Sequence, residues 1–130
     1  SYEISLWVAN EPDARYNSSI YEELLHVKQF SSKNNWKLGD MEFEAKIFIS
    51  ILQKEHKLDF GTNKTVLELF YNYYESPCPQ TFDAAKNVLY GKPFFYDRGE
   101  FPLTENMDYN ERIKHIKQII QKISNRLFLF

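Results

Sequence analysis

The stretch Asp40-Met-Glu-Phe-Glu-Ala-Lys-Ile-Phe-Ile-Ser-Ile-Leu52 decides the fold class of this chain, because it fits both a strand and a helix. Every second residue from Met41 to Ile51 is apolar, which is typical of a half-buried strand. Asp40 also suits a helix N-cap, and basic residues gather near the far end, where a helix dipole favours them. The apolar residues at helical spacing are Met41, Ala45, Phe48 and Leu52. The pattern therefore favours a helix over 41–52, with a strand as the alternative.

Shorter signals on both sides predict the other elements. Capping residues stand in front of apolar stripes at Ser19 and Thr65, and Thr81 is expected to cap a further short helix. Gly91 is expected to end that helix in the left-handed conformation that glycine favours. Residues 2–8 alternate and predict a short N-terminal strand. The predicted helices cover residues 19–31, 64–75, 82–90 and 109–126, and residues 92–107 are predicted to form a long loop.

The chain has 130 residues and is expected to form one compact domain, residues 1–130, because single domains usually contain about 100 to 150 residues. Hydrophobic residues make up 43% of the sequence and charged residues 26%, which excludes a disordered tail. No window approaches about 18 consecutive apolar residues, so no membrane span is expected. We predict a mainly α domain of four to five helices with a short N-terminal strand. The alternative is an α+β domain in which 41–52 is a strand paired with 2–8.

Residues suited to catalysis or metal binding are sparse. The three histidines are far apart in the sequence, and the single cysteine, Cys78, has no partner at metal-ligand spacing. No phosphate-binding glycine motif occurs. We therefore expect no metal, no cofactor and no enzymatic activity; a small enzyme that uses Cys78 and a histidine is the catalytic alternative. The N-terminus lacks the basic start and long apolar run of a secretory signal, which favours an intracellular protein, cytoplasmic or nuclear.

Aromatic residues make up 17% of the sequence, and several of them stand in the predicted loop 92–107. Long loops are often functional, and exposed aromatic residues beside an arginine are typical of interface hot spots, although the same rings also suit a lid over the core. A second aromatic group follows Phe70 on helix 64–75, and because its rings cannot all face one side, one or two of them are expected to be exposed. The predicted partner-binding residues are Phe94, Phe95, Tyr96, Asp97, Arg98, Glu100 and Phe101, together with Tyr71 and Tyr73.

The predicted C-terminal helix 109–126 is amphipathic and basic. Residues 111–130 contain five of the 16 Lys and Arg residues but one of the 18 Asp and Glu residues, and such asymmetry can mark a polyanion-binding end. Its isoleucine seam is expected to dock into its own domain, with a homo-oligomer as the alternative. The seam residues are Ile113, Ile116, Ile120 and Ile123, and the polyanion candidates are Arg112, Lys114, Lys117 and Lys122.

The segment Lys64-Thr65-Val66-Leu67-Glu68, followed by Tyr73-Tyr74, resembles the last helix of SANT domains. The resemblance covers about 16 residues, and it implies a chromatin-associated interaction module. The middle helix of that family has no counterpart in Gly61-Thr62-Asn63, and no functional residue is carried over from it.

Together these features predict a non-enzymatic protein–protein interaction module, either an adaptor or an inhibitor of the immunity-protein kind. Its partner is expected to be another protein, bound through the aromatic loop. The alternative is a nucleic-acid or chromatin-associated module that uses the basic C-terminal helix, and the second alternative is the enzyme built on Cys78.

Overall fold

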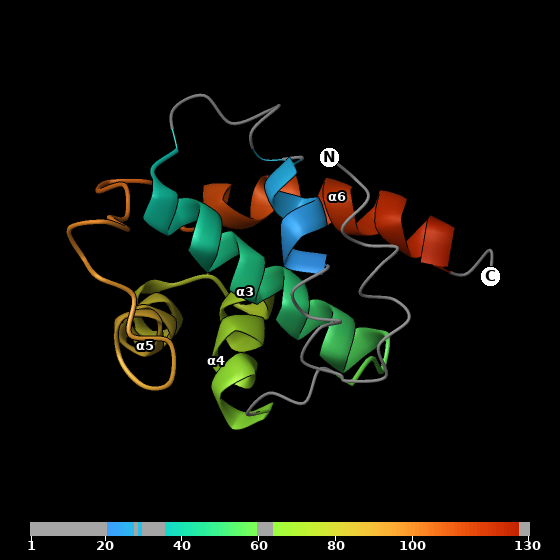
Figure 1. Ribbon diagram of the computed structural model, residues 1–130, viewed down its shortest axis with the longest axis horizontal. Coiled ribbons are helices and arrows are strands. Elements are labelled where there is room, and N and C mark those ends of the chain that lie inside the picture. Colours follow the sequence, from blue (N-terminus) through green and yellow to red (C-terminus); the bar gives the residue numbers. More distant parts are fainter. Residues whose placement is uncertain (1–20, 28, 30–35, 60–63, 128–130) are drawn as a thin grey trace.

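The computed structural model describes residues 21–27, 29, 36–59 and 64–127, with side chains up to Gln121. Its helices are a short one over residues 21–27 and 29, α3 (Leu38–Glu55), α4 (Lys64–Glu75), α5 (Pro79–Tyr90) and α6 (Glu111–Leu127) (Figure 1). No strand occurs among the described residues, so the prediction of a mainly helical fold is confirmed there. The predicted strand 2–8 lies outside the described residues. None of the described helices is long and apolar enough to cross a bilayer.

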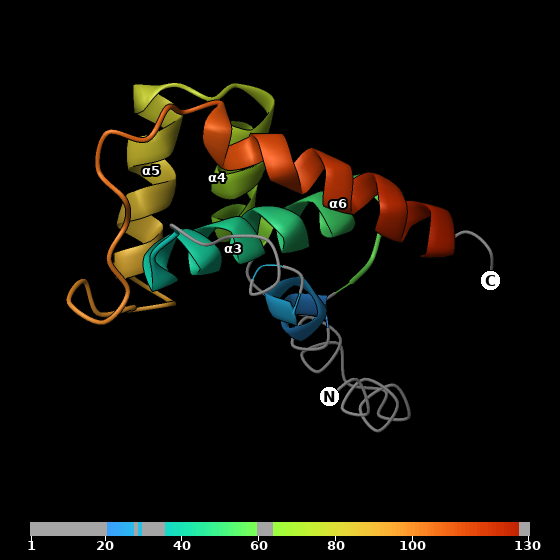
Figure 2. The same cartoon turned by 90° about the horizontal axis from the view of Figure 1, so that it is seen from above.

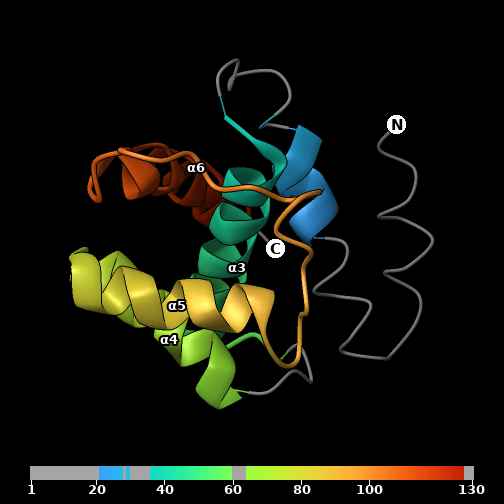
Figure 3. The ribbon, with the colours of Figure 1, turned by 90° about the vertical axis from the view of Figure 1, so that its left-hand side faces the viewer.

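Helix α3 is surrounded by the other helices. Seen end-on in Figure 3, it lies between α6, the α4–α5 pair and the short helix over residues 21–27 and 29. Residues from Gly39 to Leu52 are buried apart from the half-buried Glu42. A helix that packs on all sides needs apolar residues all around its circumference, and this explains the strand-like alternation of 41–52. The strand alternative for 41–52, and with it the pairing with 2–8, is therefore wrong.

The core around α3 is rich in aromatic rings. The ring of Phe43 lies at its centre, with the ring centroids of Phe70, Tyr73 and Phe82 at 5.3, 5.5 and 5.4 Å. These neighbours come from α4 and α5. The contacts with Phe70 and Tyr73 are edge-to-face and the contact with Phe82 is tilted; aromatic pairs of this kind contribute about 0.5–1.5 kcal/mol each beyond the burial of their area. One residue of α3 thus joins two further helices into the same core.

Helix α5 begins and ends differently from the sequence prediction. It starts at Pro79 instead of residue 82, because a proline suits the first helical position, and Thr81 accepts the N–H of Cys78 at 3.2 Å from inside the first turn. At the other end Gly91 is extended, with φ −113°, and not left-handed as predicted. A Cβ on Gly91 would lie 2.7 Å from the carbonyl oxygen of Asn87, so close backbone approach explains the glycine.

The loop between α5 and α6 crosses the start of α3 at Gly39. The N–H of Gly39 donates to the carbonyl of Pro102 at 3.0 Å. A Cβ at this position would lie 2.3 Å from the carbonyl oxygens of both Phe101 and Pro102. The missing side chain is therefore what allows the loop to lie against α3. The described residues of the predicted loop 92–107 contain neither helix nor strand, in agreement with the prediction.

We expect Gly39→Ala to lower the free energy of unfolding by about 1–3 kcal/mol, because the added methyl group meets backbone that cannot rotate away. Helix propensity alone would favour alanine by about 1 kcal/mol, so a loss would isolate the clash. Urea denaturation measures both effects. Gly99→Ala is the matched control, since its nearest neighbour is a side-chain oxygen at 3.0 Å. A Gly39→Ala protein as stable as the wild type would contradict the crossing described here.

Candidate functional site

The aromatic residues of the loop do not share one environment. Phe95 is 62% exposed, whereas Phe94, Tyr96 and Phe101 are half-buried. The ring of Phe94 points into the core, 6.2 Å from the centroid of Phe70. Of the four aromatic rings predicted to bind a partner in this loop, only that of Phe95 is presented mostly to solvent.

Tyr96 fastens the loop to α3. Its hydroxyl donates to Glu42 Oε2 at 2.9 Å, and its ring packs edge-on against Phe101 at 4.8 Å. Burial, together with the neighbouring Glu42 carboxylate, raises the pKa of Tyr96 above its ordinary range. The tyrosine therefore stays protonated and keeps donating at any ordinary pH.

Two charged residues of the loop, Asp97 and Arg98, have partners within this chain. Asp97 Oδ1 accepts the N–H groups of Gly99 and Glu100 at 2.7 and 3.1 Å, which closes a tight turn. The guanidinium of Arg98 lies 4.2 Å from the ring centroid of Tyr90 on α5. Asp97 thus stabilises the turn within the loop, and Arg98 packs the loop against α5. Glu100 is exposed on the same turn.

Tyr71 and Tyr73 do not lie on the surface. Both are buried in the core, and Tyr73 donates its hydroxyl hydrogen to the carbonyl of Tyr109. Tyr71 donates to Glu55 Oε2 at 2.8 Å. The expectation that one or two rings of this group would be exposed is not met by these two, and the more accessible ring is the half-buried Tyr74.

Among the described side chains of α6, two of the three predicted polyanion-binding residues are exposed. Lys114 and Lys117 are exposed, but Arg112 is only 3% exposed. The side chain of Lys122 lies outside the described part, as does that of Ile123. The remaining seam residues, Ile113, Ile116 and Ile120, are buried within this domain, as predicted for docking onto its own core.

Arg112 instead completes a buried polar cluster with Asp40 and Thr104. Its NH1 group donates to Asp40 Oδ1 at 2.7 Å, and its NH2 group donates to the Thr104 carbonyl at 2.8 Å. The N–H of Thr104 donates to Asp40 Oδ1 at 2.9 Å, the Thr104 hydroxyl donates to Oδ2, and the N–H of Lys37 donates to Oδ2 at 2.9 Å. Burial raises the pKa of Asp40, but the hydrogen bonds from Thr104 and Arg112 outweigh it, so that the pKa is lowered.

Sequence reasoning missed this cluster, although one signal was present. Arg112 precedes Ile116 by one helical turn, which places it beside the apolar stripe of α6 and toward the core. Asp40 was interpreted as an N-cap, and the carboxylate does accept a backbone N–H at the start of α3. It does so from the third helical position, with Lys37 at the N-cap.

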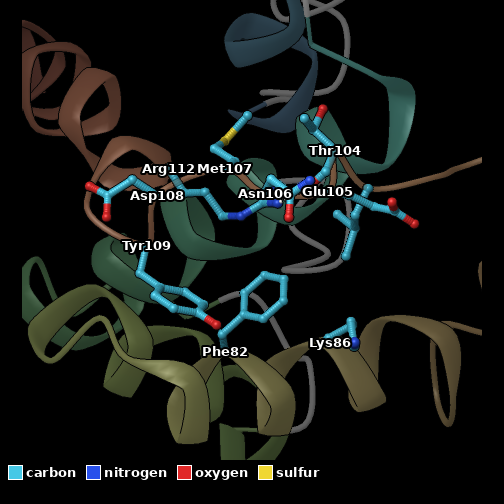
Figure 4. A pocket seen from close by; sticks show the side chains of 10 residues that line it. Phe82, Lys86, Thr104, Glu105, Asn106, Met107, Asp108, Tyr109 and Arg112 are labelled. Carbon is cyan, nitrogen blue, oxygen red and sulfur yellow. Dashed lines mark hydrogen bonds between the residues drawn. The ribbon is translucent and has the colours of Figure 1, made fainter.

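A pocket of about 730 Å³ opens beside this cluster. Figure 4 shows it between α5, which carries Phe82 and Lys86, and the segment that leads into α6. The guanidinium of Arg112 lies 4.9 Å from the ring centroid of Phe82. The lining of the pocket contains acidic, basic and apolar side chains. The lining residues are Phe82, Lys86, Leu103, Thr104, Glu105, Asn106, Met107, Asp108, Tyr109 and Arg112.

Cys78 stands at the N-cap of α5, where its thiol lies 3.4 Å from the hydroxyl of Thr81. That hydrogen bond lowers the pKa of the thiol. A threonine hydroxyl cannot serve as the general base that the catalytic alternative requires, and the described hydrogen bonds of Cys78 include none to a histidine. Within the described residues, no group of three His, Cys, Asp or Glu side chains is arranged to hold a metal ion.

No protein-family model, curated protein or solved structure matches this chain. The resemblance of helix 64–75 to SANT domains therefore gains no support from comparison. The local geometry is what remains as a basis for a functional assignment.

We expect Asp40→Ala and Arg112→Ala each to lower the free energy of unfolding by about 3–5 kcal/mol, because each leaves a buried charge without its partner. The double variant is expected to lose clearly less than the two single losses added together. Urea denaturation of all four proteins provides this double-mutant cycle. Strictly additive losses would mean that the two side chains do not depend on each other. Lys114→Ala on the exposed side of α6 is the control and should change stability by less than about 0.5 kcal/mol.

Proposed function

We propose that this chain is a non-enzymatic protein-binding module whose contact centre is Phe95. The observation that supports this proposal is an aromatic ring, 62% exposed, on a loop held by the rest of the domain. Aromatic side chains are enriched among the few residues that carry most of the binding energy of an interface. The partner is another protein, with an apolar pocket that accepts a phenyl ring.

The backbone around Phe95 supports a preorganised anchor. Phe95 has a positive backbone angle φ of 52°, a conformation that residues other than glycine rarely adopt. Two backbone hydrogen bonds hold it, from Phe95 N–H to the Gly91 carbonyl at 2.7 Å and from Tyr96 N–H to the Leu89 carbonyl at 3.1 Å. An anchor that is fixed before binding loses less conformational entropy in the complex than one on a disordered loop.

Leu38 is a second exposed apolar residue, with 49% of its surface accessible. It begins α3, immediately before the glycine on which the loop crosses that helix. We assign it to the rim of the contact surface. In this proposal the half-buried rings of Phe94, Tyr96 and Phe101 pack the loop against the domain and do not bind the partner.

The two roles of the aromatic residues separate in a variant series. Phe95→Ala is expected to leave the melting temperature almost unchanged while weakening binding of the partner by about 1–3 kcal/mol. Phe94→Ala is the matched control from the same loop; it is expected to lower stability by up to about 3 kcal/mol, because its ring is packed in the core. Thermal unfolding followed by circular dichroism measures the stability of both variants.

Binding is tested by placing a photo-crosslinking phenylalanine analogue at position 95 and, as a control, at the exposed Asn72 of α4. Capture of one protein from 95 but not from 72, with dissociation constants that rise about 5- to 150-fold for Phe95→Ala, would support the proposal. A captured protein whose affinity ignores Phe95→Ala would contradict it. Nucleic acid bound in a strongly salt-dependent way through Lys114 and Lys117 would favour the basic-helix alternative instead.

A further inference from the structure

The short helix over residues 21–27 and 29 packs on α3 through the buried Leu25 and the ring of Tyr21, which lies 6.3 Å from the ring centroid of Phe48, and it is also attached through polar side chains. Figure 2 shows it on the face of α3 opposite to α4, α5 and α6. The attachment includes four side chains that are linked in a row, and we call this group the His26 junction. Its members are His26 and Gln29 on the short helix, and Glu42 and Glu44 on α3.

The orientation of the Gln29 amide is determined by its surroundings. Its Nε2 group donates to the carbonyl of Met41 at 3.1 Å and to Glu44 Oε1 at 2.9 Å, and both of these groups are acceptors. The amide oxygen therefore points the other way, where it lies 2.6 Å from Nδ1 of His26. An amide oxygen can only accept, so Nδ1 of His26 must carry a hydrogen.

The other ring nitrogen of His26 also faces an acceptor. Nε2 lies 3.2 Å from Glu42 Oε1, and the second oxygen of that carboxylate accepts the hydroxyl of Tyr96. Nε2 must therefore carry a hydrogen as well, and an imidazole that donates from both nitrogens is positively charged. We infer that His26 is held as an imidazolium and that the His26 junction is a proton-dependent latch that fastens the helix over 21–29 to α3.

Among the described groups, loss of the proton leaves no arrangement of hydrogens that satisfies the four side chains of the junction. A neutral ring that keeps its hydrogen on Nδ1 turns the lone pair of Nε2 toward the Glu42 carboxylate. A ring that keeps it on Nε2 turns the lone pair of Nδ1 toward the Gln29 oxygen. Rotating the Gln29 amide would place its oxygen against the Met41 carbonyl and Glu44. Each choice leaves two acceptors facing each other in a largely buried place, which is costly.

The charges around His26 act in both directions. Two carboxylates favour the imidazolium: Glu42 on α3, and Glu22 on the short helix that carries His26. Lys46 on α3 is a nearby cation, but its ammonium group is paired with a carboxylate. Its Nζ lies 2.9 Å from Glu22 Oε1, and it also lies 4.7 Å from the ring centroid of Phe94. Within the part of the chain that the structure describes, the carboxylate of Glu44 and the neutral hydroxyl of Tyr96 also face the junction.

Burial lowers the pKa of His26, but its hydrogen bonds with Glu42 and Gln29 outweigh that effect and raise the pKa above the ordinary value of 6.5. A raised pKa means that the stabilisation is complete below the unfolded value and disappears as the pH rises through the folded value. Burial raises the pKa of Glu42, but the hydrogen bond and the charge of His26 outweigh that effect, so that the pKa is lowered. The contribution of the Glu42 carboxylate to stability is therefore lost only in acid. The latch is therefore closed in mildly acidic solution and opens as the pH rises through the pKa of His26.

The full chain tests this by NMR of the histidine ring nitrogens between about pH 5 and about pH 9. We expect both nitrogens of His26 to be protonated at about pH 6, with a pKa above 6.5. Amide hydrogen exchange provides the second readout. Protection of residues 21–27 is expected to fall by up to about tenfold per pH unit between the unfolded and folded pKa values of His26, while α4 amides keep their protection.

His26→Gln is expected to abolish this pH dependence, and Glu42→Gln to lower the pKa of His26. His56→Gln, at the other end of α3, is the matched control and should leave both readouts as in the wild type. One unprotonated ring nitrogen of His26 at about pH 6, or a pKa at or below its ordinary value, would overturn the inference. If His26→Gln fails to fold, the titration of the wild-type ring decides alone. The inference does not depend on the function proposed for Phe95.

Discussion

The carboxylate of Asp40 is the constraint on which the arrangement of the other segments depends. A buried charge is unstable unless it is paired and its hydrogen-bonding capacity is filled. Here the donors come from three places in the chain: the backbone before α3, the end of the α5–α6 loop at Thr104, and Arg112 in the first turn of α6. All three must be present together, so the start of α3 determines where the loop ends and where α6 begins.

The same logic continues along α3. Because this helix is buried around its circumference, each of its polar side chains has to find a partner on whichever segment covers it. Glu42 and Lys46 contact both the α5–α6 loop and the short helix before α3, while Glu44 contacts that helix through Gln29. The aromatic core around Phe43 contributes much of the apolar burial. The polar residues contribute specificity, since their hydrogen bonds are satisfied only when the partner segments occupy these positions.

These attachments bear on the proposed function, because they fasten the α5–α6 loop on both sides of Phe95. Gly91 and Leu89 hold its first part through the backbone, and Tyr96 and Thr104 hold it against α3. The other aromatic rings of this loop, those of Phe94, Tyr96 and Phe101, are half-buried against the domain. An exposed phenyl ring on a loop fastened at both ends is the observation on which its proposed assignment to a contact rests.

Local patterns in the sequence were sufficient to predict the helices α3, α4 and α6 and the irregular segment 92–107. They also predicted that the isoleucine seam faces the core. Capping signals, proline and apolar spacing act over a few residues, and they operate in the unfolded chain as they do in the folded one. The division of the loop rings into one exposed and three half-buried side chains was beyond such patterns, because Phe94 and Phe95 are neighbours of the same kind. Burial of Arg112, Tyr71 and Tyr73, and the junction at His26, were decided by what lies across from them. These outcomes depend on contacts between residues far apart in the chain, such as the 72 positions that separate Asp40 from Arg112, and only the tertiary structure brings such residues together.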